Sequence, residues 1–198
     1  MTGRKEALIL FVNACVRKNS RTKRLAECLL SRIPGEIREL RLSEIAFPVT
    51  DEAFLEKRDR LTAEKKYDDP LFDLARQFAE ADTLVIAALF WDLSFPASLR
   101  QYLEQVNVPG ITFRYTEEGI PVSLCRARRL YYVTTAGGYY FPEEYGYGYV
   151  KVLAENFYGI SDVRLIRAAG LDIEGIDAEQ VLRECMENLK LTEQTFIE

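Results

Sequence analysis

A continuous run of apolar and β-branched residues, Thr83–Ala88, constrains the fold of this chain more than any other stretch. The run is too short to cross a membrane. It lacks the polar alternation of a strand that has one face in water, and it is typical of a central strand in a parallel sheet covered on both faces. A helix over Ala97–Val106 is expected next, because Pro96 fixes the backbone angle at its start.

Aromatic residues follow this strand directly. The sequence FWDLSF, residues 90–95, contains the only Trp of the chain and stands where the strand ends. Ligands of open α/β sheets bind outside the carboxyl ends of the strands, so this cluster is a candidate binding edge. The alternative is that the aromatic rings only cover the core.

The composition narrows the class of protein. A chain of 198 residues is long enough to bury one large core, so we predict a single domain over residues 1–198. Histidine is absent, which excludes triads, metal sites and proton relays that depend on histidine. The net charge of −5 comes from interspersed acidic and basic residues and disfavours nucleic acid as a partner.

The cysteines and the apolar segments bear on the compartment. The four cysteines are widely spaced and form no CxxC pair, so we expect neither a zinc site nor any other metal site, and no redox dithiol. The first apolar run leads into polar, basic sequence without a small-residue cleavage site, and no apolar stretch is long enough for a membrane span. We therefore expect a cytoplasmic protein with no signal peptide and no membrane contact.

The segment after the first predicted strand has the features of an anion site. Residues 13–19 are polar and basic, and Ser20 can cap the helix that follows. The free N–H groups and the dipole at the start of that helix favour an anion such as phosphate. Side chains that can add donors are those of Arg17, Lys18, Ser20, Arg21 and Thr22. Neither GxGxxG nor GxxxxGK[ST] is present. An ordinary capped helix with a solvated basic end is the alternative.

Hydrophobic periodicity predicts alternating strands and helices. We expect strands over Ala7–Val12, Ile37–Leu42, Thr83–Ala88, Arg129–Thr134 and Asp162–Arg167, helices over Arg21–Arg32, Glu52–Lys66, Leu71–Glu80, Ala97–Val106, Val150–Tyr158 and Asp177–Leu191, and a hairpin over Ile111–Leu124. This order predicts an α/β fold with a doubly wound, five-stranded parallel sheet, helices on both faces and a hairpin excursion before strand four. At this length the flavodoxin-like strand order 2-1-3-4-5 is favoured.

Three loops then meet at one edge of the sheet, after strands one, three and four. The first supplies phosphate donors and the second an aromatic wall. The third contains Gly137 and Gly138, which allow the backbone to approach a flat ligand closely. This combination suits flavin mononucleotide, FMN.

The run GITFRYTEEG, Gly110–Gly119, together with the helix entry over Ala87–Leu103 and VTTAGG at Val133–Gly138, closely resembles the FMN-dependent NADH azoreductases. These belong to the NAD(P)H:quinone oxidoreductase group with a flavodoxin-like fold, and the resemblance covers nearly the whole chain. It implies an FMN-dependent enzyme that passes hydride from NADH or NADPH through the flavin to a planar small molecule, a quinone or an azo compound, by a ping-pong mechanism. No side chain of the protein is predicted to be catalytic.

The resemblance also implies which residues bind FMN. Those expected to contact it are Ser20, Arg21 and Thr22 at the phosphate, Phe90, Trp91, Asp92 and Leu93 against the ring system, and Thr135, Ala136, Gly137 and Gly138 in the third loop. The sequence departs from the family pattern in three places: an early serine is replaced around Asn13–Ala14, Asp92 stands for Asn, and Ala136 stands for Arg. Asp92 keeps an acceptor for a flavin N–H but lacks the amide donor.

Members of this family are homodimers with flavin sites at the subunit interface. A homodimer is therefore implied here, with Phe113, Tyr115 and Tyr140 as candidate walls for the substrate across the interface. Ordinary packing in the core or interface is the alternative role for each of these side chains.

Three other functions remain open. A flavin-binding electron carrier could share the fold, but the moderate charge and the TFRYTEEG sequence favour the enzyme. Hydrolysis, a label that some relatives have carried as acyl carrier protein phosphodiesterases, would need a metal cluster or an activated nucleophile, and the sequence indicates neither. A flavin-free interaction protein is the third, because a fold does not fix a function.

Overall fold

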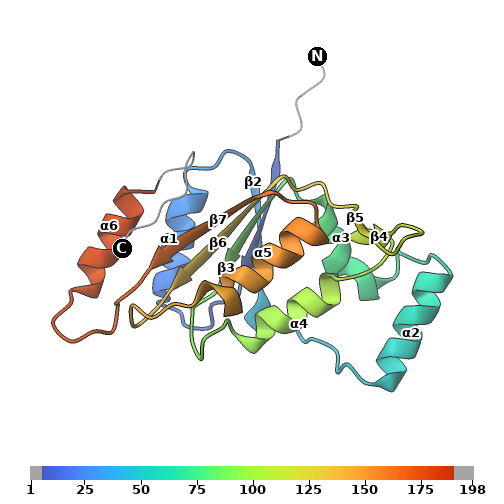
Figure 1. The fold of residues 1–198 in the computed structure, drawn as a ribbon, viewed down its shortest axis with the longest axis horizontal. Coiled ribbons are helices and arrows are strands. Elements are labelled where there is room, and N and C mark those ends of the chain that lie inside the picture. Colours follow the sequence, from blue (N-terminus) through green and yellow to red (C-terminus); the bar gives the residue numbers. More distant parts are fainter. Residues whose placement is uncertain (1–5, 190–198) are drawn as a thin grey trace, which may run out of the picture.

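The computed structural model describes residues 6–189 as a parallel sheet with helices on both faces (Figure 1). The sheet strands are β1 (Leu8–Asn13), β2 (Glu36–Arg41), β3 (Thr83–Ala87), β6 (Arg129–Thr135) and β7 (Asp162–Ala168). The helices are α1 (Arg21–Leu30), α2 (Glu52–Ala63), α3 (Asp73–Glu80), α4 (Ala97–Val106), α5 (Tyr147–Asn156) and α6 (Ala178–Glu187), with short 3-10 turns at Leu42–Glu44, Pro70–Phe72 and Glu143–Tyr145. The predicted α/β class is confirmed.

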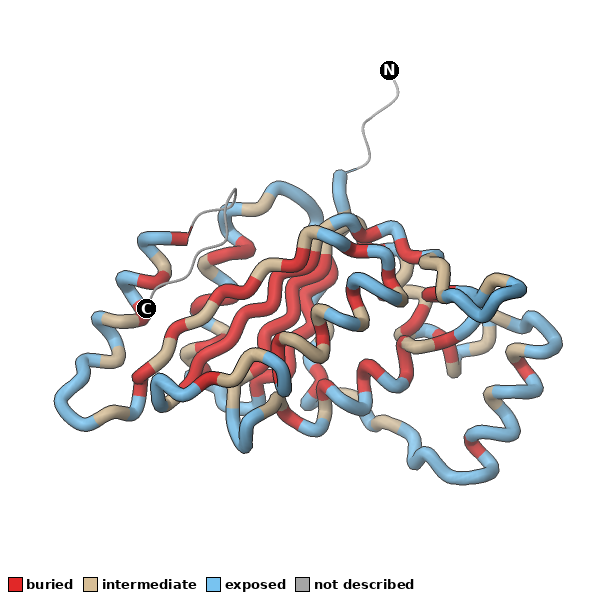
Figure 2. Tube along the Cα trace, viewed as in Figure 1, coloured by how far each residue is buried: buried red, intermediate tan, exposed pale blue. Residues whose placement is uncertain are grey.

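The strands lie in the order β2-β1-β3-β6-β7, and every neighbouring pair is parallel. The expected order 2-1-3-4-5 counted only the strands of this sheet, whereas β4 and β5 are the strands of the separate hairpin. Strand β3 is central, with β1 and β6 on its two sides, and Figure 2 shows these strands as the buried middle of the molecule. The run Thr83–Ala88 is thus a central strand, as its lack of polar alternation predicts.

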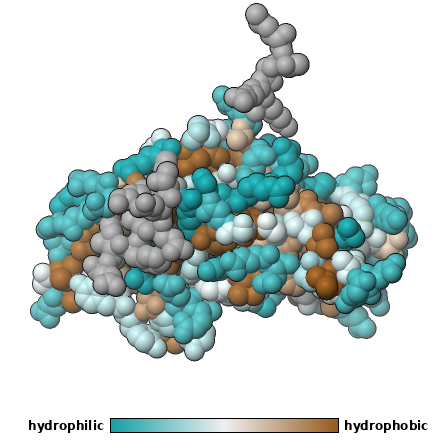
Figure 3. Space-filling view, turned by 45° about the horizontal axis from the view of Figure 1, so that its top comes forward, coloured by the Kyte–Doolittle hydropathy of each residue, from teal (hydrophilic) through white to brown (hydrophobic). Residues whose placement is uncertain are grey.

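Polar residues cover much of the outside. On the face shown in Figure 3, hydrophobic residues lie in separate areas among hydrophilic ones. Within residues 6–189, no helix is both long enough and apolar enough to cross a lipid bilayer.

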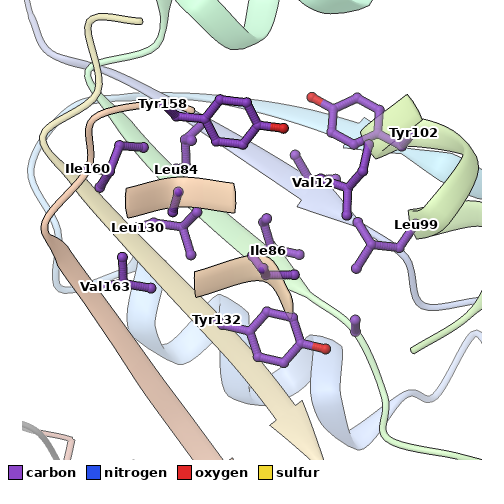
Figure 4. Packing of buried hydrophobic residues seen from close by; sticks show 14 of the residues in the cluster. Val12, Leu84, Ile86, Leu99, Tyr102, Leu130, Tyr132, Tyr158, Ile160 and Val163 are labelled. Carbon is purple, nitrogen blue, oxygen red and sulfur yellow. The ribbon is translucent and has the colours of Figure 1, made fainter. Parts of the chain in front are cut away.

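Both faces of the sheet are packed against helices. Leu84 and Ile86 of β3 point toward α3, α4 and α5, and Figure 4 shows Leu84 between Tyr158 and Leu130. Leu99 and Tyr102 of α4 belong to the same apolar layer. The alternate residues of β3 point the other way, toward Leu25 and Leu29 of α1 and Leu182 of α6. Because successive side chains of a strand point to opposite faces, two apolar layers require an unbroken apolar strand.

Several element boundaries differ from those expected. Helix α2 ends at Ala63, three residues before the predicted end, because Lys65 takes a left-handed backbone with φ 56°. The predicted helix over Leu71–Glu80 is a 3-10 turn followed by α3. Helix α5 begins three residues before the predicted start, and the last two residues of the predicted helix over Asp177–Leu191 lie outside the described residues.

The expected hairpin is present but stands apart from the sheet. Strands β4 (Phe113–Tyr115) and β5 (Pro121–Ser123) pair antiparallel and turn at Gly119, whose φ is 76°. The Ser123 hydroxyl donates a hydrogen bond of 2.6 Å to the carbonyl of Tyr158, just before β7 begins. The hairpin therefore lies near the amino ends of β6 and β7, away from the edge at which ligands bind in such folds (Figure 1).

Phe78 of α3 anchors the layer of helices on one face. Its ring is fully buried, with its centroid 4.6 Å from that of Tyr158 and 6.3 Å from that of Tyr102. We expect Phe78→Ala to lower the free energy of unfolding by about 3 to 5 kcal/mol, because it leaves a cavity between helices. Urea denaturation measures this, with Val152→Ala on the exposed face of α5 as the control, for which a change within about 0.5 kcal/mol is expected. Equal effects of the two variants would contradict this account of the core.

Candidate functional site

A pocket of about 400 Å³ lies at the carboxyl ends of β1, β3 and β6. It is lined by Arg17, Asn19, Ser20, Arg21, Thr22, Leu89, Phe90, Trp91, Thr135, Ala136, Gly137, Leu171 and Asp172. Most of these residues belong to the three loops that the sequence predicts to converge, which follow strands one, three and four of the sheet. The structure thus brings together eight of the eleven residues expected to contact FMN.

The loop after β1 presents the start of helix α1 to the pocket. The Asn13 carboxamide holds this loop, because its oxygen accepts from the N–H of Cys15 at 2.9 Å and its nitrogen donates to Glu39 at 2.8 Å. Ser20 is the N-cap of α1, and its hydroxyl accepts from the N–H of Lys23. The N–H groups of the first helical residues have no partner inside a helix, so this end of the pocket suits an anion.

A buried hydrogen bond joins this loop to the end of β6. The hydroxyl oxygens of Thr22 and Thr135 lie 2.6 Å apart, and both side chains are buried. A direct bond of this length between two buried hydroxyls fixes the start of α1 relative to the sheet. Thr22 therefore supports the floor of the pocket in addition to lining it.

The aromatic segment after β3 forms one wall. Its backbone continues along β6, since the N–H of Phe90 donates to the carbonyl of Thr135 at 3.0 Å. The Phe90 ring packs on Phe141 with a centroid distance of 4.3 Å, whereas the Trp91 side chain is 41% exposed. Phe90 is thus anchored in the protein, whereas Trp91 lines the pocket with a side chain that is partly open to solvent.

Asp92 and Leu93 lie at the tip of a tight turn and do not line the pocket. The N–H and carbonyl groups of Trp91 and Ser94 bond to each other at 3.2 and 2.9 Å, and the two residues between them have φ of 50° and 63°. This is the geometry of a two-residue type I′ hairpin, in which Asn-Gly is the usual pair. A leucine in this left-handed conformation is strained. Both side chains point outward and are exposed.

Backbone segments form the opposite wall. Residues 136–138 pair with residues 168–172, through bonds that include Leu171 N–H to Ala136 O at 3.2 Å and Asp172 N–H to Gly137 O at 3.0 Å. A Cβ atom on Gly137 would lie 2.6 Å from a carboxylate oxygen of Asp172, so any other residue here would force the Asp172 side chain to move. Gly138 is exposed and lies beyond the pocket lining.

Five lining residues were not among the expected FMN contacts: Arg17, Asn19, Leu89, Leu171 and Asp172. Of these, only Arg17 was a candidate donor at the anion site. Leu171 and Asp172 belong to the loop after β7, the fifth strand of the sheet. The rule that ligands bind at the carboxyl ends of parallel strands applies to that loop as well. Applied to strand five, the same rule would have indicated Leu171 and Asp172 as candidate lining residues.

The three residues expected at the subunit interface lie outside this pocket. Phe113 is buried, with its ring 4.9 Å from that of Phe157, and Tyr115 beside it on β4 is 52% exposed. Tyr140 follows the third loop and is 75% exposed. Within one chain, the hairpin pair is at the other end of the sheet, so a role at the pocket would require a second subunit.

The pKa shifts of the buried cysteines indicate no activated thiol. Burial raises the pKa of the Cys15 thiol, against a smaller lowering effect of the Ser20 hydroxyl. Burial also raises the pKa of Cys125 to about 12 and that of Cys185 to about 11. These thiols stay protonated near neutral pH, and protonated thiols are poor nucleophiles. In residues 6–189, no three acidic or cysteine side chains cluster as metal ligands would.

The strained turn gives a stability prediction. We expect Leu93→Gly to raise the free energy of unfolding by about 1 kcal/mol, because glycine adopts the left-handed backbone without a Cβ clash and Leu93 loses little burial. Leu124→Gly is the matched control: Leu124 is similarly exposed but is not left-handed, so glycine there should destabilise. Thermal unfolding of both variants measures the effect. A lower midpoint for Leu93→Gly would contradict the strain.

Comparison with known proteins places the chain in a family. The model of a family described as having a flavodoxin-like fold matches residues 7–191. An FMN-dependent NADH:quinone oxidoreductase of Clostridium acetobutylicum is 42% identical over 134 residues, which are 65% of this chain and 66% of that protein. One of Clostridium beijerinckii is 31% identical over 198 residues, covering 96% of this chain and 99% of its own.

A solved structure agrees with these sequence matches. An FMN-dependent NADH-azoreductase of Bacillus anthracis, crystallised in complex with FMN, superposes with a TM-score of 0.73 at 25% identity, covering 91% of this chain and 94% of that one. The resemblance read from TFRYTEEG and VTTAGG is therefore confirmed. The family match and the full-length relative together show that this chain belongs to the flavodoxin-like family that includes the FMN-dependent NADH:quinone oxidoreductases and azoreductases.

Proposed function

We propose that this protein is an FMN-dependent NADH oxidoreductase that reduces quinones, azo compounds or similar planar acceptors. One observation carries the proposal: the loops after β1, β3 and β6 meet in one pocket that has a helix N-terminus at one end and an aromatic side chain with a glycine backbone at the other. The names of the Clostridium and Bacillus relatives agree with it.

The residues of the pocket fit FMN. Its volume of about 400 Å³ is within the usual range for a small-molecule site. Ser20, Arg21 and Thr22 at the start of α1 would hold the phosphate, because N–H groups and a guanidinium are donors suited to an anion. Phe90, Trp91 and the backbone of residues 135–137 would hold the ring system, since aromatic side chains and a glycine backbone both line the pocket.

When bound, FMN would accept hydride from a nicotinamide and pass it to the acceptor. The protein's part is then binding and orientation. The Thr22–Thr135 bond and the Phe90–Thr135 bond hold both ends of the pocket on the same strand, so phosphate and ring would be positioned relative to one rigid element. The exposed face of Trp91 offers a stacking surface for planar donors and acceptors at the mouth.

We also infer a finer assignment. The protein acts as a homodimer in the cytoplasm and uses NADH or NADPH, and Tyr115, Phe113 and Tyr140 contribute to the walls of the partner's substrate site. Exposed apolar side chains on the hairpin support this, since Tyr115 is 52% exposed and Ile120 59%. The four free cysteines suit a reducing compartment. Of the three aromatic residues, Phe113 is the least exposed, so it would act mainly by supporting Tyr115.

A spectroscopic experiment tests the proposed activity. Purified protein is mixed with FMN, freed of excess flavin and examined by visible absorption without oxygen. We expect retained yellow colour that NADH bleaches and a quinone restores, because both reactants use the one flavin. Retained colour that NADH cannot bleach would favour an electron carrier, and no retained flavin would refute the proposal.

The homodimer has its own test. We expect Tyr115→Asp to give a monomer in analytical ultracentrifugation at a concentration where the unchanged protein is a dimer, because a buried charge opposes an apolar contact. Ile176→Asp is the control, since Ile176 is exposed in the loop between β7 and α6, far from the hairpin. A monomeric unchanged protein would refute the dimer, and a dimeric Tyr115→Asp variant would remove Tyr115 from its interface.

A further inference from the structure

An ion pair in the pocket lining joins the start of α1 to the loop after β7. A guanidinium nitrogen of Arg21, the first residue of α1, lies 2.9 Å from a carboxylate oxygen of Asp172. The same nitrogen donates to the carbonyl of Leu171 at 3.2 Å. All three residues line the pocket. The guanidinium nearest the helix N-terminus is therefore already bound by a carboxylate of the protein.

The backbone fixes the position of Asp172. Its N–H donates to the carbonyl of Gly137 at 3.0 Å. The carboxylate oxygen that does not contact Arg21 lies 2.6 Å from the position that a Cβ atom on Gly137 would take. The carboxylate is thus held between the guanidinium and the glycine loop. By contrast, Arg17 lines the same pocket, and no ion pair joins it to another side chain among the residues that the structure describes.

We propose that Asp172 weakens the binding of phosphorylated flavin by holding Arg21, so that the Arg21–Asp172 pair sets how strongly the pocket prefers FMN over riboflavin. This inference rests on the proposed function. The carboxylate weakens phosphate binding in two ways. It occupies donors of Arg21 that would otherwise bind phosphate, and its charge repels a phosphate that carries up to about two negative charges. Riboflavin has no phosphate, so neither effect changes its affinity.

The expected size is modest. Arg21 and Asp172 have side chains that are 38% and 72% exposed, and solvent weakens pairs of this kind. Asp172→Asn keeps the shape of the side chain and removes its charge. We expect it to tighten FMN binding by about two- to fivefold and to leave riboflavin binding unchanged. The control is Glu174→Gln, which removes one negative charge from the same loop at an exposed position outside the pocket.

The measurement is a titration of each protein with FMN and with riboflavin, followed by flavin fluorescence at fixed ionic strength. A double-mutant cycle then locates the effect. Arg21→Gln should weaken FMN binding more in the Asp172→Asn protein than in the unchanged protein, because only there is the guanidinium free of its carboxylate partner. Arg17→Gln should weaken it by nearly the same factor in both, since Arg17 does not pair with Asp172.

The possible results are distinct. Unchanged FMN affinity in Asp172→Asn, or an equal gain with Glu174→Gln, would overturn the inference. Equal weakening of FMN and riboflavin would also overturn it, and would mean that Asp172 binds the flavin directly. If the unchanged protein bound neither flavin, the proposed function itself would fail and this inference with it. Thermal unfolding of each variant verifies that altered affinity does not reflect loss of the fold.

Discussion

The burial of β3 on both faces is the constraint on which the rest of the structure depends. An apolar strand with two covered faces needs helices above and below, and parallel neighbours joined by crossover helices supply them. Because β1, β3, β6 and β7 all run in the same direction, their carboxyl ends lie along one edge, and the loops that follow them meet there. The pocket is thus a consequence of how the core is covered.

Hydrogen bonds between these loops turn a shared edge into a defined site. Thr135 has the central place, because its hydroxyl contacts Thr22 at 2.6 Å and its carbonyl accepts from the N–H of Phe90 at 3.0 Å. One residue of β6 therefore joins the anion end and the aromatic wall. A substitution of Thr135 would remove the hydroxyl contact with Thr22, whereas the bond to Phe90 uses the backbone carbonyl and does not depend on the side chain.

The elements that depend on hydrophobic periodicity and on helix caps could be predicted from the sequence. The limits of α4 agree with the prediction because Pro96 fixes its start, and Ser20 caps α1 as expected. Local conformations that sequence patterns do not encode were missed. The left-handed turn at Asp92 and Leu93 lacks the glycine that marks such turns, so no sequence pattern indicated that these two residues would lie outside the pocket.

Contacts between distant segments account for the remaining difference. Asp172 lies about 150 residues from Arg21 in the sequence, and their pairing follows only from the closeness of the loop after β7 to the start of α1. This pairing changes the electrostatics of the site. A helix N-terminus with a free arginine would bind a phosphate strongly, whereas one whose arginine is shared with a carboxylate binds it less tightly. One acidic residue on a neighbouring loop can thus change the affinity of such a site for phosphate without a change in the geometry of the pocket.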